Sequence, residues 1–265
     1  MSGAVEGVVT YRAGGTEVIC LTDGLLDLGT GVFPEVAPER REAAHPGGLR
    51  IEVNVHLLRH ADGSLDLVDT GCGPEIYGGA GGRLPGLLAR LGIAPEQIGR
   101  VIFTHLHGDH AAGALDAEGR PVFPAAHLVM HEAELAHWQG REDSAGGRLI
   151  AACGDRIAVV RDGDDLGQGL RAWFLPGHTP GHMGLRLGAE VALIGDLVHS
   201  VALQLADPAV HTRYDSDSAQ GDLSRRLAFE TVAAERLVIS GGHMMAGEKF
   251  LRLMPDGAGF RGIAP

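Results

Sequence analysis

The stretch His105-Leu106-His107-Gly108-Asp109-His110 follows an apolar run and holds three imidazoles and a carboxylate within six residues. A strand alternates its side chains between two faces, so it cannot gather all of these groups on one side. A tight turn at the end of a strand can do so, and Gly108 permits such a turn. Imidazole nitrogens combined with a carboxylate oxygen suit zinc and similar divalent metals without any thiolate. The stretch therefore predicts a metal site on a turn after a buried strand.

Three later segments end in groups of the same kind. His178 and His182 lie in a turn punctuated by glycine and proline, Asp196 ends an apolar run, and His243 follows another apolar run. Four predicted strand ends thus deliver metal-binding groups. Since one zinc site takes three or four protein ligands, a set of this size indicates two metals, with one carboxylate able to bridge them.

The order HxHxDH, GHTPGH, GD and GH, from about Asn54 to His243, resembles the signature of the metallo-β-lactamase superfamily. The resemblance implies an α/β (α+β) fold, an αββα sandwich of two mixed sheets flanked by helices. It implies two divalent metal ions, most simply zinc. The first metal would be bound by His105, His107 and His178, the second by Asp109, His110 and His243, and Asp196 would bridge them. Asp69 and His182 match positions that support the ligands from behind.

The segment from Asp196 to Ser218 resembles the branch of methyl parathion hydrolase and the quorum-quenching lactonases. This resemblance implies a hydrolase in which a metal-bridging hydroxide attacks a lactone, an ester or a phosphotriester. Asp109 would accept a proton after the attack. His199 stands where the best-known acyl-homoserine lactonases carry tyrosine, so it either contacts the substrate or only supports the metal site. Trp138 matches an aromatic residue that lines the substrate cavity, but packing at a helix end explains it equally well.

Other activities occur on the same scaffold. A thioesterase resembling hydroxyacylglutathione hydrolase would need a helical extension after His243, where the chain offers little room before Pro265. An enzyme resembling persulfide dioxygenase would use one iron and fewer ligands. A metal-binding module without catalysis is the alternative of a different class. Two zinc-like ions, one iron or no metal would distinguish these possibilities.

The net charge and the apolar content of the chain limit the classes of partner that it can bind. A net charge of −12 disfavours nucleic acid, because neutralising phosphates requires clustered Lys and Arg. There is no apolar run of about 18 residues, so we expect no membrane partner. The start of the chain lacks the pattern of a signal peptide, and Cys20, Cys72 and Cys153 show no metal or redox spacing. We therefore expect a cytoplasmic enzyme with a small-molecule substrate, and a homodimer is compatible with these features.

The apolar pattern predicts one domain over residues 1–265. Strands are expected at 17–21 and 51–58, with a hairpin turn at 61–63. Helices are expected at 84–91, 131–139 and 218–235, the last with Leu223, Leu227 and Thr231 on one face. Residues 25–48 show no periodicity. They predict a long irregular loop, either mobile over the metals or forming a surface loop or dimer arm.

Overall fold

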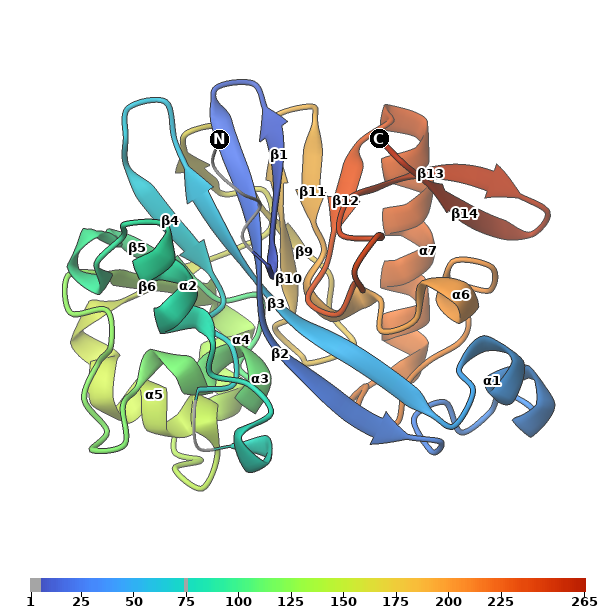
Figure 1. Cartoon of the computed structure of the whole chain (residues 1–265), viewed down its shortest axis with the longest axis horizontal. Coiled ribbons are helices and arrows are strands. Elements are labelled where there is room, and N and C mark those ends of the chain that lie inside the picture. Colours follow the sequence, from blue (N-terminus) through green and yellow to red (C-terminus); the bar gives the residue numbers. More distant parts are fainter. Residues whose placement is uncertain (1–5, 74–75) are drawn as a thin grey trace. The chain divides into compact units, whose positions relative to one another are not determined.

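The computed structural model describes residues 6–73 and 76–265 (Figure 1). Within these ranges the chain divides into two compact units. Unit 1 comprises the described residues up to Leu25 together with Val53–Val160, and unit 2 comprises Leu26–Glu52 together with Arg161–Pro265. The expectation of one domain over residues 1–265 stays a prediction, because compact units of this kind occur within single domains as well as between domains.

The first sheet of the described residues has seven strands in the order of the chain. Its antiparallel pairs are β1 with β2 and β3 with β4, and its parallel pairs are β4 with β5, β5 with β6, and β6 with β7. The sheet is therefore mixed. Its strands are β1 Val8–Ala13, β2 Thr16–Gly29, β3 Leu49–Arg59, β4 Leu65–Val68, β5 Arg100–Ile102, β6 His127–His131 and β7 Ile157–Val160.

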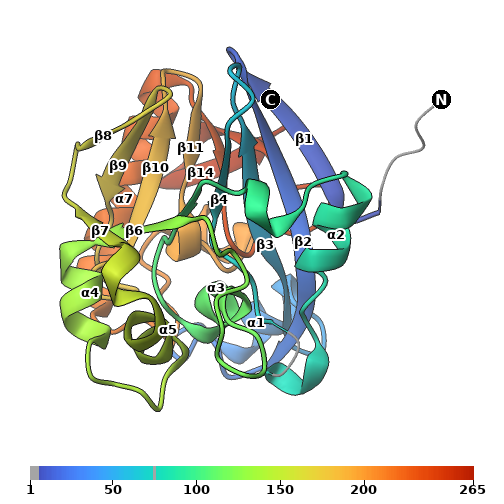
Figure 2. The ribbon, with the colours of Figure 1, turned by 90° about the vertical axis from the view of Figure 1, so that its left-hand side faces the viewer.

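The predicted strands and hairpin of unit 1 are confirmed, although β2 runs farther than expected. His60 N–H donates to the Ser64 carbonyl at 3.0 Å, and Ser64 N–H donates to Asp62 Oδ1 at 2.9 Å, which closes the turn between β3 and β4. The helices are α2 Leu84–Arg90, α3 Gly108–Ala111, α4 Glu132–Trp138 and α5 Ala145–Cys153. Figure 2 shows α3, α4 and α5 grouped together, and α5 contacts both of the others. Their apolar side chains join those of the strands in one buried core.

Unit 2 contains the second seven-stranded mixed sheet, in the order β14-β13-β12-β11-β10-β9-β8. The only parallel pair in the part of this sheet that the structure describes is β11 with β12. Parallel neighbours end at the same sheet edge, so the segments after β11 and β12 start close together. The strands are β8 Asp165–Gly167, β9 Leu170–Phe174, β10 Met183–Leu187, β11 Val191–Leu193, β12 Val238–Ser240, β13 Leu251–Asp256 and β14 Gly259–Ile263.

The long helix α7, Ser218–Glu235, has the predicted bounds, and its face with Leu223 and Leu227 is not the face that packs on the core. Leu223 and Leu227 are 50% and 54% exposed. The buried face instead consists mostly of small residues around Phe229 and packs on β13 (Figure 1). Small side chains allow the helix to approach its neighbours closely, and at one point Gly221 leaves no room for a Cβ on Gly177, which would lie 2.2 Å from the Gly221 nitrogen.

Residues 25–48 are more ordered than predicted. Strand β2 continues to Gly29, and helix α1 spans Pro38–Ala44. The short helix α6 spans Val201–Gln204 and belongs to a later part of the chain. Helix α1 buries none of its residues. A helix without a buried apolar stripe leaves no periodic signal in the sequence, which explains why the pattern suggested only a loop.

The three cysteine thiols lie in the interior of the protein. Cys20, Cys72 and Cys153 are all buried and form no disulfide. Burial raises the pKa of the Cys72 thiol far above its usual range, and the nearby carboxylates of Asp109 and Asp23 add to this effect. Among the described residues, no helix combines the length and the apolar composition that crossing a bilayer requires.

Candidate metal centre

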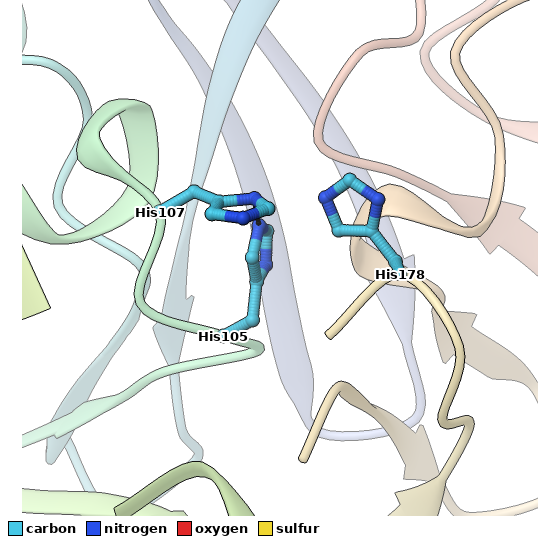
Figure 3. Close-up of side chains that lie close together, drawn as sticks. All are labelled: His105, His107 and His178. Atoms are coloured by element: carbon cyan, nitrogen blue, oxygen red, sulfur yellow. Dashed lines mark hydrogen bonds between the residues drawn. The ribbon is translucent and has the colours of Figure 1, made fainter. Parts of the chain in front are cut away.

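Three imidazoles of unit 1 cluster on the turn after β5. His107 precedes the first turn of α3, and its Nδ1 lies 3.1 Å from His105 Nε2. The His105 ring also lies 4.1 Å from the His110 ring, centroid to centroid. Figure 3 shows the rings of His105 and His107 turned toward one another. His105 and His110 are fully buried, and Asp109 is 8% exposed. The turn thus presents the compact donor set that the sequence pattern predicts.

Asp69 holds this turn from behind. Its carboxylate accepts hydrogen bonds from Thr104 N–H and from the Thr104 hydroxyl, both at 2.8 Å. Its Oδ2 also lies 2.8 Å from His110 Nδ1. The hydroxyl of Thr70 donates to the His110 carbonyl at 2.8 Å. A carboxylate that takes the outer nitrogen of an imidazole fixes the ring and leaves the other nitrogen for a metal.

A second buried carboxylate, which the sequence analysis missed, supports the turn from α4. Glu134 is fully buried and accepts hydrogen bonds from Leu106 N–H at 2.8 Å and from Trp138 Nε1 at 2.5 Å. The Trp138 ring meets the His107 ring edge-on at 5.7 Å and also packs against the core of unit 1. Trp138 therefore adjoins a candidate ligand as well as the core, and its role in lining a substrate cavity stays a prediction.

In unit 2, three imidazoles point at one carboxylate oxygen. Asp196 lies in the short 3₁₀ helix after β11, and His243 follows β12 at the same sheet edge. Asp196 Oδ2 lies 2.9 Å from His243 Nε2, 3.3 Å from His178 Nε2 and 3.4 Å from His199 Nε2. All four side chains are nearly fully buried. His178, which Figure 3 also draws, shares with Asp196 and His199 a group of ligand atoms within 4.8 Å of one another.

The outer nitrogens of His178 and His243 also have partners. His178 Nδ1 lies 2.9 Å from Asp215 Oδ1, and His243 Nδ1 lies 3.1 Å from the Glu52 carbonyl oxygen. His182 differs, because its Nδ1 faces the Leu175 carbonyl at 2.7 Å while its Nε2 accepts the Asp196 N–H at 3.0 Å. Both nitrogens of His182 are thus engaged with the backbone. It orients the Asp196 loop and offers no nitrogen to a metal in this arrangement.

The electrostatics of unit 2 fit a cation at this position. Burial lowers the pKa of His178, but hydrogen bonds to Asp196 and Asp215 outweigh burial and raise it to about 9. His178 therefore carries a proton at neutral pH when no metal is bound. A divalent cation can take the place of that proton, since metal ligation requires neutral imidazole. Buried imidazole nitrogens around one carboxylate, with outer nitrogens held by the protein, form the donor set that zinc-like metals prefer.

His199 is the least constrained of these rings. Its Nδ1 is buried and has no hydrogen-bond partner in the part of the chain that the structure describes. Burial lowers the pKa of His199, and the neighbouring rings of His243 and His178 lower it further against the opposing effect of Asp196. Its ring stacks on Tyr214 with centroids 6.4 Å apart. His199 is thus a neutral imidazole beside the Asp196 carboxylate.

Asp215 and Arg225 form a buried support that sequence analysis did not identify. Arg225 lies on α7, is 1% exposed, and donates from Nε to the Leu197 carbonyl at 2.7 Å. Its guanidinium also lies 3.6 Å from Asp215 Oδ2. Burial opposes ionisation of Asp215, but His178 and Arg225 hold its pKa well below the usual range. The segment containing Asp215 was noted as a branch motif, but nothing in it distinguishes this carboxylate from its neighbours Asp207 and Asp217.

The contact between Asp215 and His178 should contribute to metal affinity. We expect Asp215→Asn to weaken binding of zinc by roughly 10–100-fold, because the amide cannot hold the His178 ring and its proton in the same way. Competition with a chromogenic chelator measures this affinity directly. Asp222→Asn, on the exposed Arg226 pair of α7, is the matched control and should leave the affinity unchanged. Equal zinc affinity in both variants would show that Asp215 does not support a metal ligand.

Comparison with known proteins agrees with this donor set. A family model described as the metallo-beta-lactamase superfamily matches residues 49–243, a range that contains every candidate ligand. An N-acyl homoserine lactonase of Bacillus cereus is 27% identical over 179 residues, covering 66% of this chain and 67% of that protein. Another from Bacillus thuringiensis is 25% identical over 238 residues, covering 81% of this chain and 90% of its own length.

Two solved structures resemble the whole chain. The hydrolase AbOPH of the β-lactamase superfamily has a TM-score of 0.87 at 24% identity and covers 98% of each chain. AidC, a dizinc quorum-quenching lactonase in complex with a product, has a TM-score of 0.89 at 19% identity, covering 98% of this chain and 97% of its own. At these identities the likeness concerns the fold, and together with the family match it confirms the predicted αββα fold class.

Proposed function

Since the chain belongs to the metallo-β-lactamase superfamily and is a metal-dependent hydrolase, we propose that it opens the ring of a lactone with a pair of divalent metal ions. The favoured substrate is an N-acyl homoserine lactone. The observation that carries the proposal is the convergence of His178, His199 and His243 on Asp196. Relatives that align over most of the chain and are named N-acyl homoserine lactonases support the choice of substrate.

We propose that the donor set implied by the family resemblance holds a pair of metal ions. His105, His107 and His178 would hold one metal, Asp109, His110 and His243 would hold the other, and Asp196 would contribute its carboxylate to both. The order of these residues within the range matched by the family model supports this assignment. The buried carboxylates behind them, Asp69 and Asp215, support it further because each one orients a ligand imidazole. Zinc is the metal that these nitrogen and carboxylate donors favour.

The bound pair supplies water with a pKa lowered toward about 7 and polarises the carbonyl under attack. The chain itself positions the groups around that chemistry. Asp196 keeps its orientation because its backbone N–H donates to His182, whose other nitrogen is held by the Leu175 carbonyl. His199 is neutral, and its Nδ1 has no hydrogen-bond partner among the described residues, which supports a role in holding the substrate or in donating to the departing alkoxide. Asp109 is the proposed acceptor of the proton released by attack.

A substrate panel on protein of measured metal content tests the proposal. It contains acyl-homoserine lactones, simple γ- and δ-lactones, aryl esters and a paraoxon-type triester. We expect two equivalents of metal, the highest kcat/KM on a lactone, and activity that disappears with a chelator and returns with zinc. A loaded protein that hydrolyses triesters or aryl esters but no lactone would overturn the substrate class. A protein that binds two metals and hydrolyses nothing on the panel would remove the proposed function altogether.

A further inference from the structure

Two cavities in unit 2 share one wall. The first, of about 340 Å³, is lined by His199 and His243 together with Ser200, Val201, Ala202 and Met245 on its far side. The second, of about 270 Å³, lies between β2 and α1 and is lined by Val32, Phe33 and Pro38. Both cavities are bounded by His45, Gly48 and Leu49. His45 and Leu49 are therefore the side chains that border both cavities, and His45 extends from the segment after α1 to the Ser200 hydroxyl.

His45 is held in this position from several sides. Its Nε2 lies 2.6 Å from the Ser200 hydroxyl oxygen. That oxygen accepts the Leu203 N–H at 3.1 Å, so the hydroxyl proton is available to His45. The His45 ring stacks on Phe33 with centroids 6.4 Å apart and an interplanar angle of 21°. Burial lowers the pKa of His45 and so favours the neutral form of its ring.

We propose that the first cavity receives the apolar tail of the substrate and that His45 is the wall that limits the length of that tail. This inference rests on the proposed function, because it assigns the tail of the lactone to the space beside His199 and His243. The position of the cavity supports it, since its lining includes two of the side chains that surround Asp196. A substrate whose carbonyl reaches Asp196 therefore has this cavity within reach of its acyl group.

Apolar side chains in both linings suit an alkyl tail. Leu49, Val201, Ala202 and Met245 line the first cavity together with the charged residues Arg50 and Glu248. Val32, Phe33 and Pro38 line the second cavity together with Arg41 and Glu42. Each methylene that leaves water for such a surface strengthens binding by about fourfold. A tail longer than the first cavity meets the His45 ring and gains nothing further. Removal of that ring joins the two spaces and gives a longer tail more apolar surface.

Substitutions of His45 test whether its ring limits the length of the bound tail. In wild-type protein, kcat/KM should rise with tail length and then stop rising. In His45→Ala the rise should continue, so that the ratio of kcat/KM for twelve-carbon over six-carbon tails increases by about tenfold or more. His45→Phe keeps a ring of similar size without the hydrogen bond to Ser200 and should keep the wild-type limit. His45→Gln, which can still bond Ser200, should be intermediate. His127→Ala, on an exposed histidine of β6, is the matched control.

A binding series separates this inference from the proposed activity. Calorimetry with ring-opened N-acyl-homoserines of graded tail length measures the same limit without any turnover. We expect the affinity of wild-type protein to level off with tail length and that of His45→Ala to keep rising. The same length dependence in wild-type, Ala and Phe variants would overturn the inference, whether or not lactones are hydrolysed. A protein without lactonase activity that shows the expected shift in binding would contradict only the proposed function.

Discussion

Asp196→Asn is expected to lower kcat/KM on the best substrate by roughly 10³-fold while the protein stays folded. The amide has nearly the size of the carboxylate but no charge. Asp196 Oδ2 lies within 3.4 Å of imidazole nitrogens from His178, His199 and His243, so the charge is shared by the whole group. Without it, one metal should bind weakly and the attacking water should lose its position. Elemental analysis should report fewer than two metals per chain, and circular dichroism should be unchanged.

The matched control for this variant is Asp165→Asn. Asp165 lies on the exposed strand β8. Its carboxylate forms an ion pair with Arg171 at the surface. Its substitution should change neither metal content nor turnover. If Asp196→Asn kept two metals and wild-type kcat/KM, the bridging assignment would be wrong. Activity restored by excess zinc would instead mean that the carboxylate contributes mainly to metal affinity.

The candidate donors lie on turns directly after apolar strands, as the sequence predicted, because this signal is local. Each turn combines an apolar run, which predicts a strand, with donors placed immediately after it, as at His105 and Asp196. Helix α7 has the bounds predicted from the sequence. In the structure, the Asp217 side chain accepts the Gln220 N–H and caps the start of this helix, which ends at Glu235. Local chemistry of this kind needs no knowledge of what packs against it.

Features that depend on distant packing could not be predicted. The exposed Leu223 and Leu227 look like a core stripe until the close approach of Gly177 to Gly221 shows which face of α7 is buried. Arg225 looks like an ordinary surface residue of a helix, yet its partners Leu197 and Asp215 belong to other segments. Such contacts join residues far apart in the sequence. No periodicity or spacing records them, so buried support for a site is the part that requires a structure.

His199→Ala is expected to lower kcat by about 10²–10⁴ with both metals retained, which is the usual contribution of a positioned acid or base. The physical reason is that His199 is buried and neutral. Its Nε2 lies 3.4 Å from Asp196 Oδ2, and its Nδ1 has no hydrogen-bond partner within residues 6–73 and 76–265. Such a ring can meet the substrate or the departing alkoxide. Turnover and metal content measured on the same sample distinguish this role from ligation, because His199, His178 and Asp196 also form a group with metal-binding geometry.

The substitution His199→Tyr tests the same role from the side of the substrate. Tyrosine stands at this place in the lactonase pattern that the sequence resembles, so lactone hydrolysis should rise relative to triester hydrolysis in this variant. Tyr214, which stacks on the His199 ring, provides the matched control as Tyr214→Phe, since the ring remains and only the hydroxyl is lost. If His199→Ala lost metal and regained full activity with excess zinc, His199 would be a ligand. If every substrate class changed by less than roughly threefold with metal content unaltered, a catalytic role would be ruled out, because that change is far below the contribution of a working acid or base.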